Sequence, residues 1–395
     1  MLDYLKKKYV ELVASVLDPI ATKVLALSLA SRVALVIAFP GVWAAWEYRE
    51  NVKHAVAFAS RIAAVARAPS GNVPLSADLR GRAIDVAFRL RAASARDTNL
   101  VDSGELTGWS AAQALMAIAN DPTHNSQAQI FAAYIREKQL KSCSCWAELN
   151  TEDERRSWLF ISGWVLAAFS DAKIAGTESE IQYLLKHQNV DGSWTSTSNT
   201  HRPEFASTYA TSWAIIGLSK QARNNLLSPE LSPSAKSAVA RGSAWLLNHR
   251  QNGSRWKPYP LLPASSPSGS VSGLALHALH SADISNLRDI DAQWLDNLPN
   301  VAVPASIGEN SYVEIKAEQV LLIDHFVQLT MPWMLIATVD AYEVGSLAQR
   351  ARSLAWIELL LQHDSIRNAD TEQANWWRAE VATAMNKLAL RVRVQ

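Results

Sequence analysis

The chain of 395 residues contains 49% apolar residues, with 38 basic and 37 acidic side chains. This apolar fraction is enough for a sizeable core, in one large domain or two ordinary ones, so the chain is globular rather than disordered. Nucleic-acid binding as the main function is disfavoured, because phosphate recognition needs a concentrated basic surface and the two signs of charge nearly cancel here.

The N-terminal residues predict a segment that associates with a membrane or with a partner protein. Residues 1–17 have the apolar spacing of an amphipathic helix, and residues 24–46 form an apolar stretch long enough to span a bilayer. Arg32 and the kink expected at Pro40 work against spanning. Two interpretations of residues 1–46 therefore stay open: a membrane-spanning or interfacial helix, and a hydrophobic hairpin packed on the body or on a partner. We assign residues 1–67 to this segment.

After a linker at residues 68–74, helical periodicity predicts an all-α body over residues 75–395. Similar apolar segments recur at intervals of about 50 to 60 residues, the length of a helical hairpin. They begin at Gln113, Gly163, Ser212, Gly273 and Pro332. More amphipathic helices precede them, at residues 80–93, 127–138, 178–187, 234–248 and 347–362. We expect about six helical hairpins, with an inner and an outer ring of helices.

Tryptophan is unusually frequent, with 15 residues against 8 phenylalanines. Rings of this size either wedge helices together or line apolar pockets. Trp164, Trp213 and Trp333 share one phase of the repeat, so they either contact a common cavity or pack inner helices against outer ones.

One junction between an outer and an inner helix has a sharper pattern. Gln188 ends the outer helix, Asp191 and Gly192 supply a turn, and the Trp194 indole is placed to cover it. This segment resembles the QW motif of squalene and related triterpene cyclases, and residues 207–218 resemble the inner helix that follows that motif.

Two weaker copies of this pattern are found elsewhere. The copy at residues 245–256 is degenerate, and Gly108-Trp109 is interpreted as a worn third copy. The resemblance implies the α/α toroid of terpenoid cyclases and prenyltransferase β subunits, in which a double ring of helices surrounds an apolar cavity, usually on a monotopic membrane protein.

The chain departs from that family at its proton donor. Type II terpene cyclases use an Asp-x-Asp-Asp motif, which is absent. The nearest match, Asp289-Ile290-Asp291, is interpreted as solvated carboxylates at the start of an outer helix. Glu204 and Asp324 are the candidate catalytic acids, with Asp191 as a further one. Helix capping by Glu204, and a hydrogen-bonded Asp324-His325 pair at a helix terminus, are the structural alternatives.

No metal or cofactor is predicted. Prenyltransferases of this fold hold zinc with aspartate, cysteine and histidine, and the Asp-x-Cys pairing of that family is missing. Cys143 and Cys145 together with His201, His277 or His280 form the only conceivable zinc set, and two half-buried structural cysteines are the simpler interpretation. With only these two cysteines, so close in sequence, a reducing cytoplasmic setting is expected.

Two main hypotheses remain, and the β-like half of a heteromeric prenyltransferase, which requires a bound metal, is a third. The favoured hypothesis is a non-catalytic, membrane-associated cytoplasmic toroid that binds a lipid, an isoprenoid or a protein. The alternative is an isoprenoid (terpene) cyclase or prenyltransferase-like enzyme with an unfamiliar acid. In either case the expected cavity or ligand-binding residues are Trp164, Tyr209, Trp213, His325 and Trp333.

Overall fold

The computed structural model describes residues 49–147, 158–196, 205–263, 265–298, 308–317, 320–369 and 375–392, with the backbone alone for residues 50–52, 308–317, 320–331 and 364–365. The chain divides into two compact units, Met1–Ser60 and Arg61–Gln395. The predicted membrane-associating residues 1–46 lie outside the described residues. Among the helices that are described, none has both the length and the apolarity needed to cross a bilayer.

Inner and outer helices alternate along the second unit, as the repeat predicts. The inner helices are α7 (Gly108–Ile118), α9 (Leu159–Asp171), α11 (Thr208–Arg223), α13 (Gly269–Ser281), α15 (Thr330–Ala341) and α18 (Asn375–Val392). The outer helices are α5 (Ala77–Arg96), α8 (Asn125–Glu137), α10 (Glu178–Lys186), α12 (Ser232–Asn248), α14 (Arg288–Asp296) and α16 (Leu347–Gln362). The remaining helical elements are α4 (Arg49–Arg67), α6 (Asn99–Ser103), η1 (Pro122–His124), η4 (Tyr342–Val344) and α17 (Asp364–Arg367).

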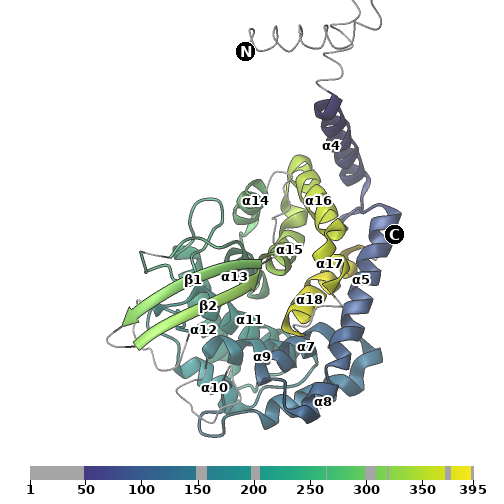
Figure 1. The fold of residues 1–395 in the computed structure, drawn as a ribbon. Coiled ribbons are helices and arrows are strands. Elements are labelled where there is room, and N and C mark those ends of the chain that lie inside the picture. The colour runs from purple at the N-terminus through teal and green to yellow at the C-terminus, as the bar shows by residue number, and fades with distance from the viewer. Residues whose placement is uncertain are drawn as a thin grey trace, which may run out of the picture. The chain divides into compact units, whose positions relative to one another are not determined.

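The inner helices form a closed ring. Each contacts the next in chain order, from α7 through α9, α11, α13 and α15 to α18, and α18 contacts α7. Figure 1 shows α9, α11 and α13 running side by side. The outer helices pack on the inner ones, α8 on α7, α12 on α11 and α5 on α18. This arrangement confirms the predicted all-α fold of helical hairpins.

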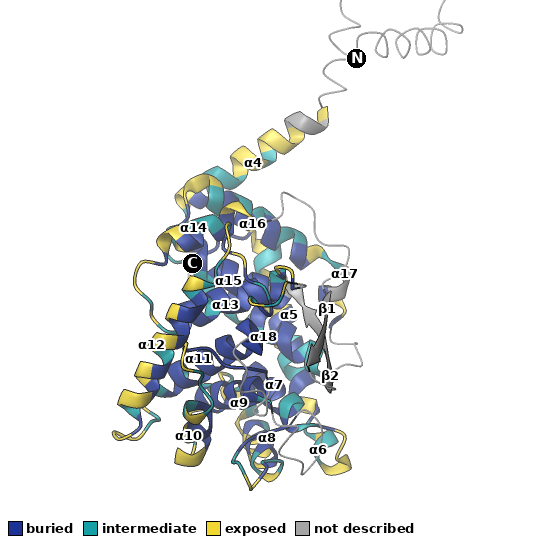
Figure 2. Ribbon diagram, turned by 90° about the vertical axis from the view of Figure 1, so that its left-hand side faces the viewer, coloured by how far each residue is buried: buried dark blue, intermediate teal, exposed yellow. Residues whose placement is uncertain are grey.

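The apolar pattern determines which helices are inside. In α9 every residue except the last is buried, whereas α10 and α12 are buried on one face and exposed on the other (Figure 2). Side-chain caps begin several inner helices: Thr107, Ser207 and Ser268 each accept a hydrogen bond from a backbone N–H of the first turn. The ring therefore encloses the core.

Two pairs of inner helices approach unusually closely at glycines. A Cβ atom on Gly163 of α9 would lie 2.6 Å from the Trp213 backbone of α11, and one on Gly217 would lie 2.4 Å from the Gly163 carbonyl oxygen. Gly273 of α13 packs in the same way against the Trp333 backbone of α15. The side chains of Trp213 and Trp333 are thereby held at fixed positions along the ring.

A β-hairpin precedes α15 and was not predicted. Strands β1 (Gly308–Ala317) and β2 (Val320–Leu329) pair antiparallel, with Gly308 opposite Leu329 and Ala317 opposite Val320. The expected helix terminus at Asp324 and His325 is therefore wrong, because both residues lie on β2. The apolar run of residues 320–323 suits a strand as well as a helix, which is why periodicity did not separate the two.

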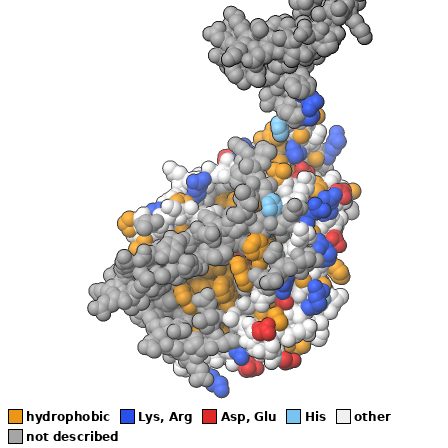
Figure 3. All heavy atoms as spheres, viewed as in Figure 1, with side chains coloured by type: hydrophobic (Ala, Val, Ile, Leu, Met, Phe, Trp, Pro, Cys, Tyr) orange, Lys and Arg blue, Asp and Glu red, His pale blue; other side chains and the backbone are white. Residues whose placement is uncertain are grey.

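On the face shown in Figure 3, basic and acidic side chains are interspersed, and hydrophobic side chains gather near the centre of the face.

Candidate functional site

The first turns of the inner helices meet inside the ring. Trp109 of α7 makes edge-to-face contacts with Phe160 and Trp164 of α9, at centroid distances of 5.5 and 5.8 Å. Phe160 contacts Tyr209 of α11 at 5.0 Å. Since these residues lie in the first two turns of their helices, this end of the ring interior is aromatic.

Three tryptophans extend this contact across the ring. The Trp164 and Trp213 rings stack, with centroids 3.8 Å apart and planes inclined by 17°. Trp333 of α15 is nearly perpendicular to both, at 5.7 Å from Trp164 and 5.2 Å from Trp213. Because α9 and α15 are not neighbours in the ring, these indoles bridge its interior. We call Trp109, Trp164, Trp213 and Trp333 the interior tryptophan cluster.

A buried carboxyl group lies beside this cluster. Glu380 of α18 is 5% exposed. Its Oε1 accepts a hydrogen bond from Gln113 Nε2 of α7 at 3.0 Å, and its Oε2 accepts one from Trp333 Nε1 at 3.2 Å. Burial raises the pKa of Glu380 to about 8, and the two hydrogen bonds oppose this shift only in part. Glu380 is therefore largely protonated at neutral pH.

The chemistry available here is that of a neutral acid in an apolar, aromatic site. A protonated carboxyl group is able to donate a proton, and the faces of indole rings attract cations. The Gln113 and Trp333 donors are placed to stabilise the carboxylate that proton transfer would leave. Perturbed acids of this kind, buried beside a specific set of partners, are typical of functional sites.

The structure brings together four of the five predicted ligand-binding residues. Trp164, Tyr209, Trp213 and Trp333 are all buried in the ring interior and connected by ring contacts. His325 and the candidate acid Asp324 lie on β2, for which the structure gives the backbone alone. The other candidate acid, Glu204, lies outside the described residues.

The predicted turn residues form a compact unit that is hydrogen-bonded to α12. Trp194 donates its indole N–H to the Leu184 carbonyl at 2.8 Å. Gln188 Nε2 donates to the carbonyls of Gly192 and Ala238, so it ties the turn to the next outer helix. Asp191 accepts hydrogen bonds from the Ser193 backbone and from the Trp245 indole, the latter at 3.1 Å. One oxygen of Asp191 therefore holds the turn, and the other joins it to α12.

Two other turns repeat this indole contact. Trp256 donates to the Leu246 carbonyl, and Trp146 donates to the Ile135 carbonyl, each at 2.8 Å. The third turn therefore ends at Trp146, and Gly108-Trp109 instead begins α7. The sequence pattern did not reveal this turn, because Cys143-Ser144-Cys145 occupies the positions that Asp191-Gly192-Ser193 has in the first copy.

The two cysteines form a disulfide, with their Cα atoms 5.2 Å apart. This agrees with the interpretation of Cys143 and Cys145 as structural cysteines. Structural disulfides are typical of oxidising compartments, and the cytoplasmic location stays a prediction. The bond also removes both thiolates from any zinc set.

Of the three candidate zinc-binding histidines, His201 lies outside the described residues, and the other two pair with carboxylates on neighbouring helices. His280 Nε2 lies 2.8 Å from Asp291 of α14, which is buried, so the expectation of a solvated carboxylate is wrong at this position. His277 Nδ1 lies 2.8 Å from Asp340 of α15. No group of three or more possible metal ligands occurs within the described part of the chain.

The opposite end of the ring interior carries charged side chains. Lys220 pairs with Asp171 at 2.7 Å, and Asp340 bridges His277 and Lys387. Burial, with Lys387 nearby, lowers the pKa of His277 to about 4. Burial alone would raise the pKa of Asp340, but Lys387 and His277 hold it well below its usual range. These charged groups pair with one another, and they come from α9, α11, α13, α15 and α18. The cluster therefore connects five inner helices at this end of the ring.

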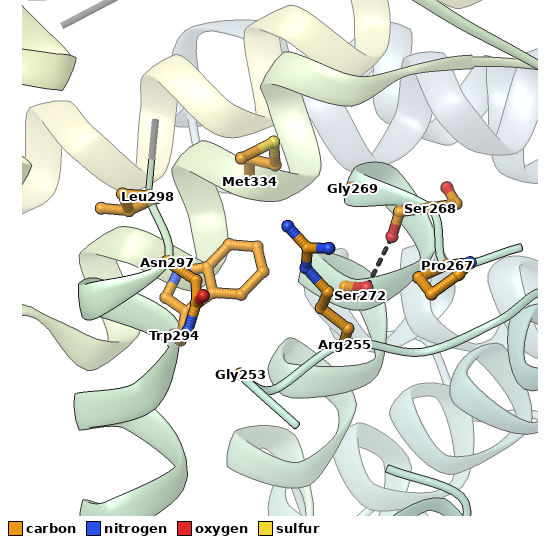
Figure 4. Close-up of a pocket in the computed structure, with 10 residues that line it drawn as sticks. All are labelled: Gly253, Arg255, Pro267, Ser268, Gly269, Ser272, Trp294, Asn297, Leu298 and Met334. Atoms are coloured by element: carbon orange, nitrogen blue, oxygen red, sulfur yellow. Dashed lines mark hydrogen bonds between the residues drawn. The ribbon is translucent and has the colours of Figure 1, made fainter. Parts of the chain in front are cut away.

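Two described cavities lie apart from the tryptophan cluster. One, of about 220 Å³, is bounded by α13, α14 and α15, and Arg255 extends into it towards Met334 from the side opposite Trp294 (Figure 4). Arg255 is the additional residue between the glycine and the tryptophan of the degenerate copy at residues 245–256. The other cavity, of about 480 Å³, lies among α11, α12 and α13.

Glu380 was missed at the sequence level. It lies 47 residues after Trp333, which is close to the repeat interval. Adding one more repeat after the segment at Pro332 therefore leads to Glu380. Its helix was overlooked because residues 375–392 contain four charged residues, more than any of the other inner helices.

Comparison with known proteins agrees with this architecture. No family model matches the chain, and no curated protein matches it. Among solved structures, the type II terpene cyclase MstE from Scytonema with its product merosterolic acid A is similar, with a TM-score of 0.52 and 12% identity over 80% of this chain and 100% of that one. A structure of MstE with its substrate geranylgeranyl dihydroxybenzoate gives a TM-score of 0.50 and 12% identity, over 80% and 99%. The chain therefore has the fold of the terpenoid cyclases.

Proposed function

We propose that the chain is a terpene-cyclase-like enzyme that acts on an isoprenoid chain inside the ring, with Glu380 as the acid. The observation that supports this most directly is a neutral carboxyl group buried against the interior tryptophan cluster. An isoprenoid offers an apolar surface and electron-rich double bonds to such a site. The fold's solved relatives, whose substrate and product are terpenoid, agree with this ligand class.

The proposed reaction is a redox-neutral isomerisation. Glu380 donates its proton to the bound chain, and the cation that forms is attacked by a double bond of the same chain, closing a ring. The faces of Trp164, Trp213 and Trp333 stabilise the cation. Loss of a proton from a carbon beside the final cation ends the reaction, and this proton returns to the Glu380 carboxylate.

Binding requires a rearrangement of the aromatic side chains. The stacked Trp164 and Trp213 rings occupy the interior, so an isoprenoid has to separate them from each other or from Trp333. A stacked aromatic pair contributes about 0.5–1.5 kcal/mol beyond its buried area, which the apolar contacts of a bound chain are able to offset.

The test is turnover of polyprenyl substrates of several chain lengths by the full chain and by Glu380→Gln. The glutamine keeps the size of the side chain but has no acidic proton, so we expect product formation to fall by about 10²–10⁴-fold. Wild-type activity should also decline above about pH 8, where Glu380 ionises.

The matched control is Glu178→Gln, which changes an exposed carboxylate on α10 and should leave the rate unaltered. Equal activity of Glu380→Gln and the wild type would remove Glu380 as the acid. The absence of product from every chain length tested would end the enzyme hypothesis.

A second candidate is a non-catalytic toroid that binds a lipid or a protein partner, and the filled ring interior is the observation that favours it. In this case apolar ligands bind without turnover. Membrane association through residues 1–46 belongs to the same proposal. It predicts that the full chain floats with lipid vesicles and that a chain lacking these residues does not.

A further inference from the structure

The buried indoles fall into two groups according to their hydrogen bonds. Several donate to an oxygen, namely Trp146, Trp194, Trp245, Trp256, Trp294 and Trp333. Within the described residues, five indole Nε1 atoms have no acceptor, and three of them, those of Trp109, Trp164 and Trp213, belong to the interior tryptophan cluster, while Trp356 and Trp377 lie outside it. Three neighbouring donors of one cluster are thus unpaired, although buried polar groups are nearly always hydrogen-bonded.

The cost of this arrangement is substantial. A buried donor without an acceptor destabilises the fold, because it has lost its hydrogen bonds to water and gained none in return. Trp164 and Trp213 are each 1% exposed, so bulk water does not reach their N–H groups. A phenylalanine at either position would provide an aromatic face without an unpaired donor. The donors therefore point to an acceptor that arrives with a bound molecule.

The electrostatic setting restricts the acceptor to a neutral group. The polar neighbours that shift the pKa of Glu380 are Trp333 and Gln113, and no charged group among the described residues contributes. The described cation–π pairs involve Phe169 and Tyr134, not the interior cluster. A phosphate or carboxylate buried here would lack a counter-ion, which is costly in an apolar interior.

We infer that the molecule bound in the ring is an isoprenoid carrying a neutral oxygen function, such as an aldehyde or ketone, whose oxygen accepts hydrogen bonds from the Trp164 and Trp213 indoles. This inference rests on the proposed isoprenoid ligand and narrows it, because it excludes a plain hydrocarbon and a diphosphate as the preferred ligand.

The acid strength of Glu380 agrees with this ligand class. A carboxyl group whose pKa is raised to about 8 is a weak proton donor. A carbonyl oxygen is a better proton acceptor than a carbon–carbon double bond. A ligand with such an oxygen near Glu380 and the two indoles thus suits the site better than a bare polyene.

The test compares three ligands of equal chain length on the full chain by calorimetry: farnesene, farnesal and farnesyl diphosphate. We expect farnesal to bind about tenfold more tightly than farnesene, a difference of about 1.4 kcal/mol, which lies within the range that two hydrogen bonds contribute. In the Trp164→Phe, Trp213→Phe double variant, farnesal should lose this advantage while farnesene affinity changes little.

Trp356→Phe is the matched control. The Trp356 indole on the outer helix α16 is also buried and also lacks a described acceptor, but it lies outside the cluster, so its loss should leave all three affinities unchanged. Equal binding of farnesal and farnesene by the wild type overturns the inference but leaves the proposed function intact. Preferential binding of the diphosphate does the same. Failure of all three ligands to bind removes the proposed function itself.

A measurement on the unmodified side chains keeps the test independent of variant folding. In ¹⁵N spectra of the wild type, the indole N–H signals of Trp164 and Trp213 should move downfield on addition of farnesal and not of farnesene. Single Trp→Phe variants assign the two signals. Unmoved signals in a complex that calorimetry shows to be formed would contradict the hydrogen bonds.

Discussion

Glu380 makes the stability of the folded chain depend on pH. Its pKa is about 8 in the folded chain against an ordinary value of 4.5. Between these values the folded chain holds a proton that the unfolded chain has lost, so the free energy of unfolding falls as pH rises, by at most about 1.4 kcal/mol per pH unit. The glutamine side chain in Glu380→Gln is uncharged over this whole pH range. Its free energy of unfolding, measured by urea denaturation, should therefore fall less steeply over this window.

The control for this measurement is again Glu178→Gln, whose pH profile should follow that of the wild type. Burial also raises the pKa values of Glu180 and Asp97, but both residues are present in every variant, so the difference between profiles isolates Glu380. Parallel wild-type and Glu380→Gln profiles would show that this carboxyl group ionises normally in the folded chain.

At the residue scale, the sequence indicated which tryptophans come together but not the buried acid. The common phase of Trp164, Trp213 and Trp333 follows from the repeat, and a repeat that closes into a ring brings equal phases together. Glu380 has no motif around it, since its acidity depends on burial by helices distant in sequence. Gln113, its hydrogen-bond partner, is 267 residues away.

At the scale of elements, the pairing of α9 with α11 depends on two glycines. A Cβ atom on Gly163 would meet Trp213 backbone atoms at 2.6 Å, a distance that side-chain rotation does not relieve. Gly163→Ala should therefore reduce the free energy of unfolding by about 2–3 kcal/mol, in the range of overpacked cores. Displacement of α11 should also disturb the Trp164–Trp213 stack, which near-ultraviolet circular dichroism would report.

Gly81→Ala is the matched comparison, because a Cβ atom there has no neighbour within 4 Å. On the exposed face of α5 the alanine should stabilise the chain by about 0.5–1 kcal/mol, through the lower helix propensity of glycine. Opposite signs for the two substitutions are expected. A neutral Gly163→Ala would mean that the helices separate readily.

The elements that sequence reasoning found and missed differ in a physical way. The outer helix at residues 347–362 was predicted with its observed bounds, because Ser346 caps it and its apolar spacing is helical. The β-hairpin was missed because residues 318 and 319, which join its strands, are Glu and Gln rather than the Asn-Gly or Asp-Gly of the usual two-residue turns. Local sequence therefore identified helices with caps, and did not identify a strand pair without turn residues.

For the whole molecule, closure of the ring joins helices from the two ends of the second unit. Asn386 of α18 spans this junction: its Nδ2 donates to the Ala117 carbonyl of α7 at 2.7 Å, and its Oδ1 accepts from Arg91 of α5 at 2.8 Å. Arg378 of α18 adds an ion pair with Asp97 at 2.6 Å. These contacts distinguish a closed toroid from an open superhelix, in which the first and last repeats do not touch.

An open array of helical hairpins loses stability locally, because each repeat contacts only its neighbours. In a closed ring, weakening the junction should lower the stability of every inner helix. Asn386→Ala removes two hydrogen bonds and should cost about 1–3 kcal/mol. Native-state hydrogen exchange should then show the same loss of protection in α11, far from the junction, as in α7 and α18. A loss confined to α5, α7 and α18 would instead mean that the hairpins open one at a time, and that the buried setting of Glu380 opens while the rest of the ring stays folded.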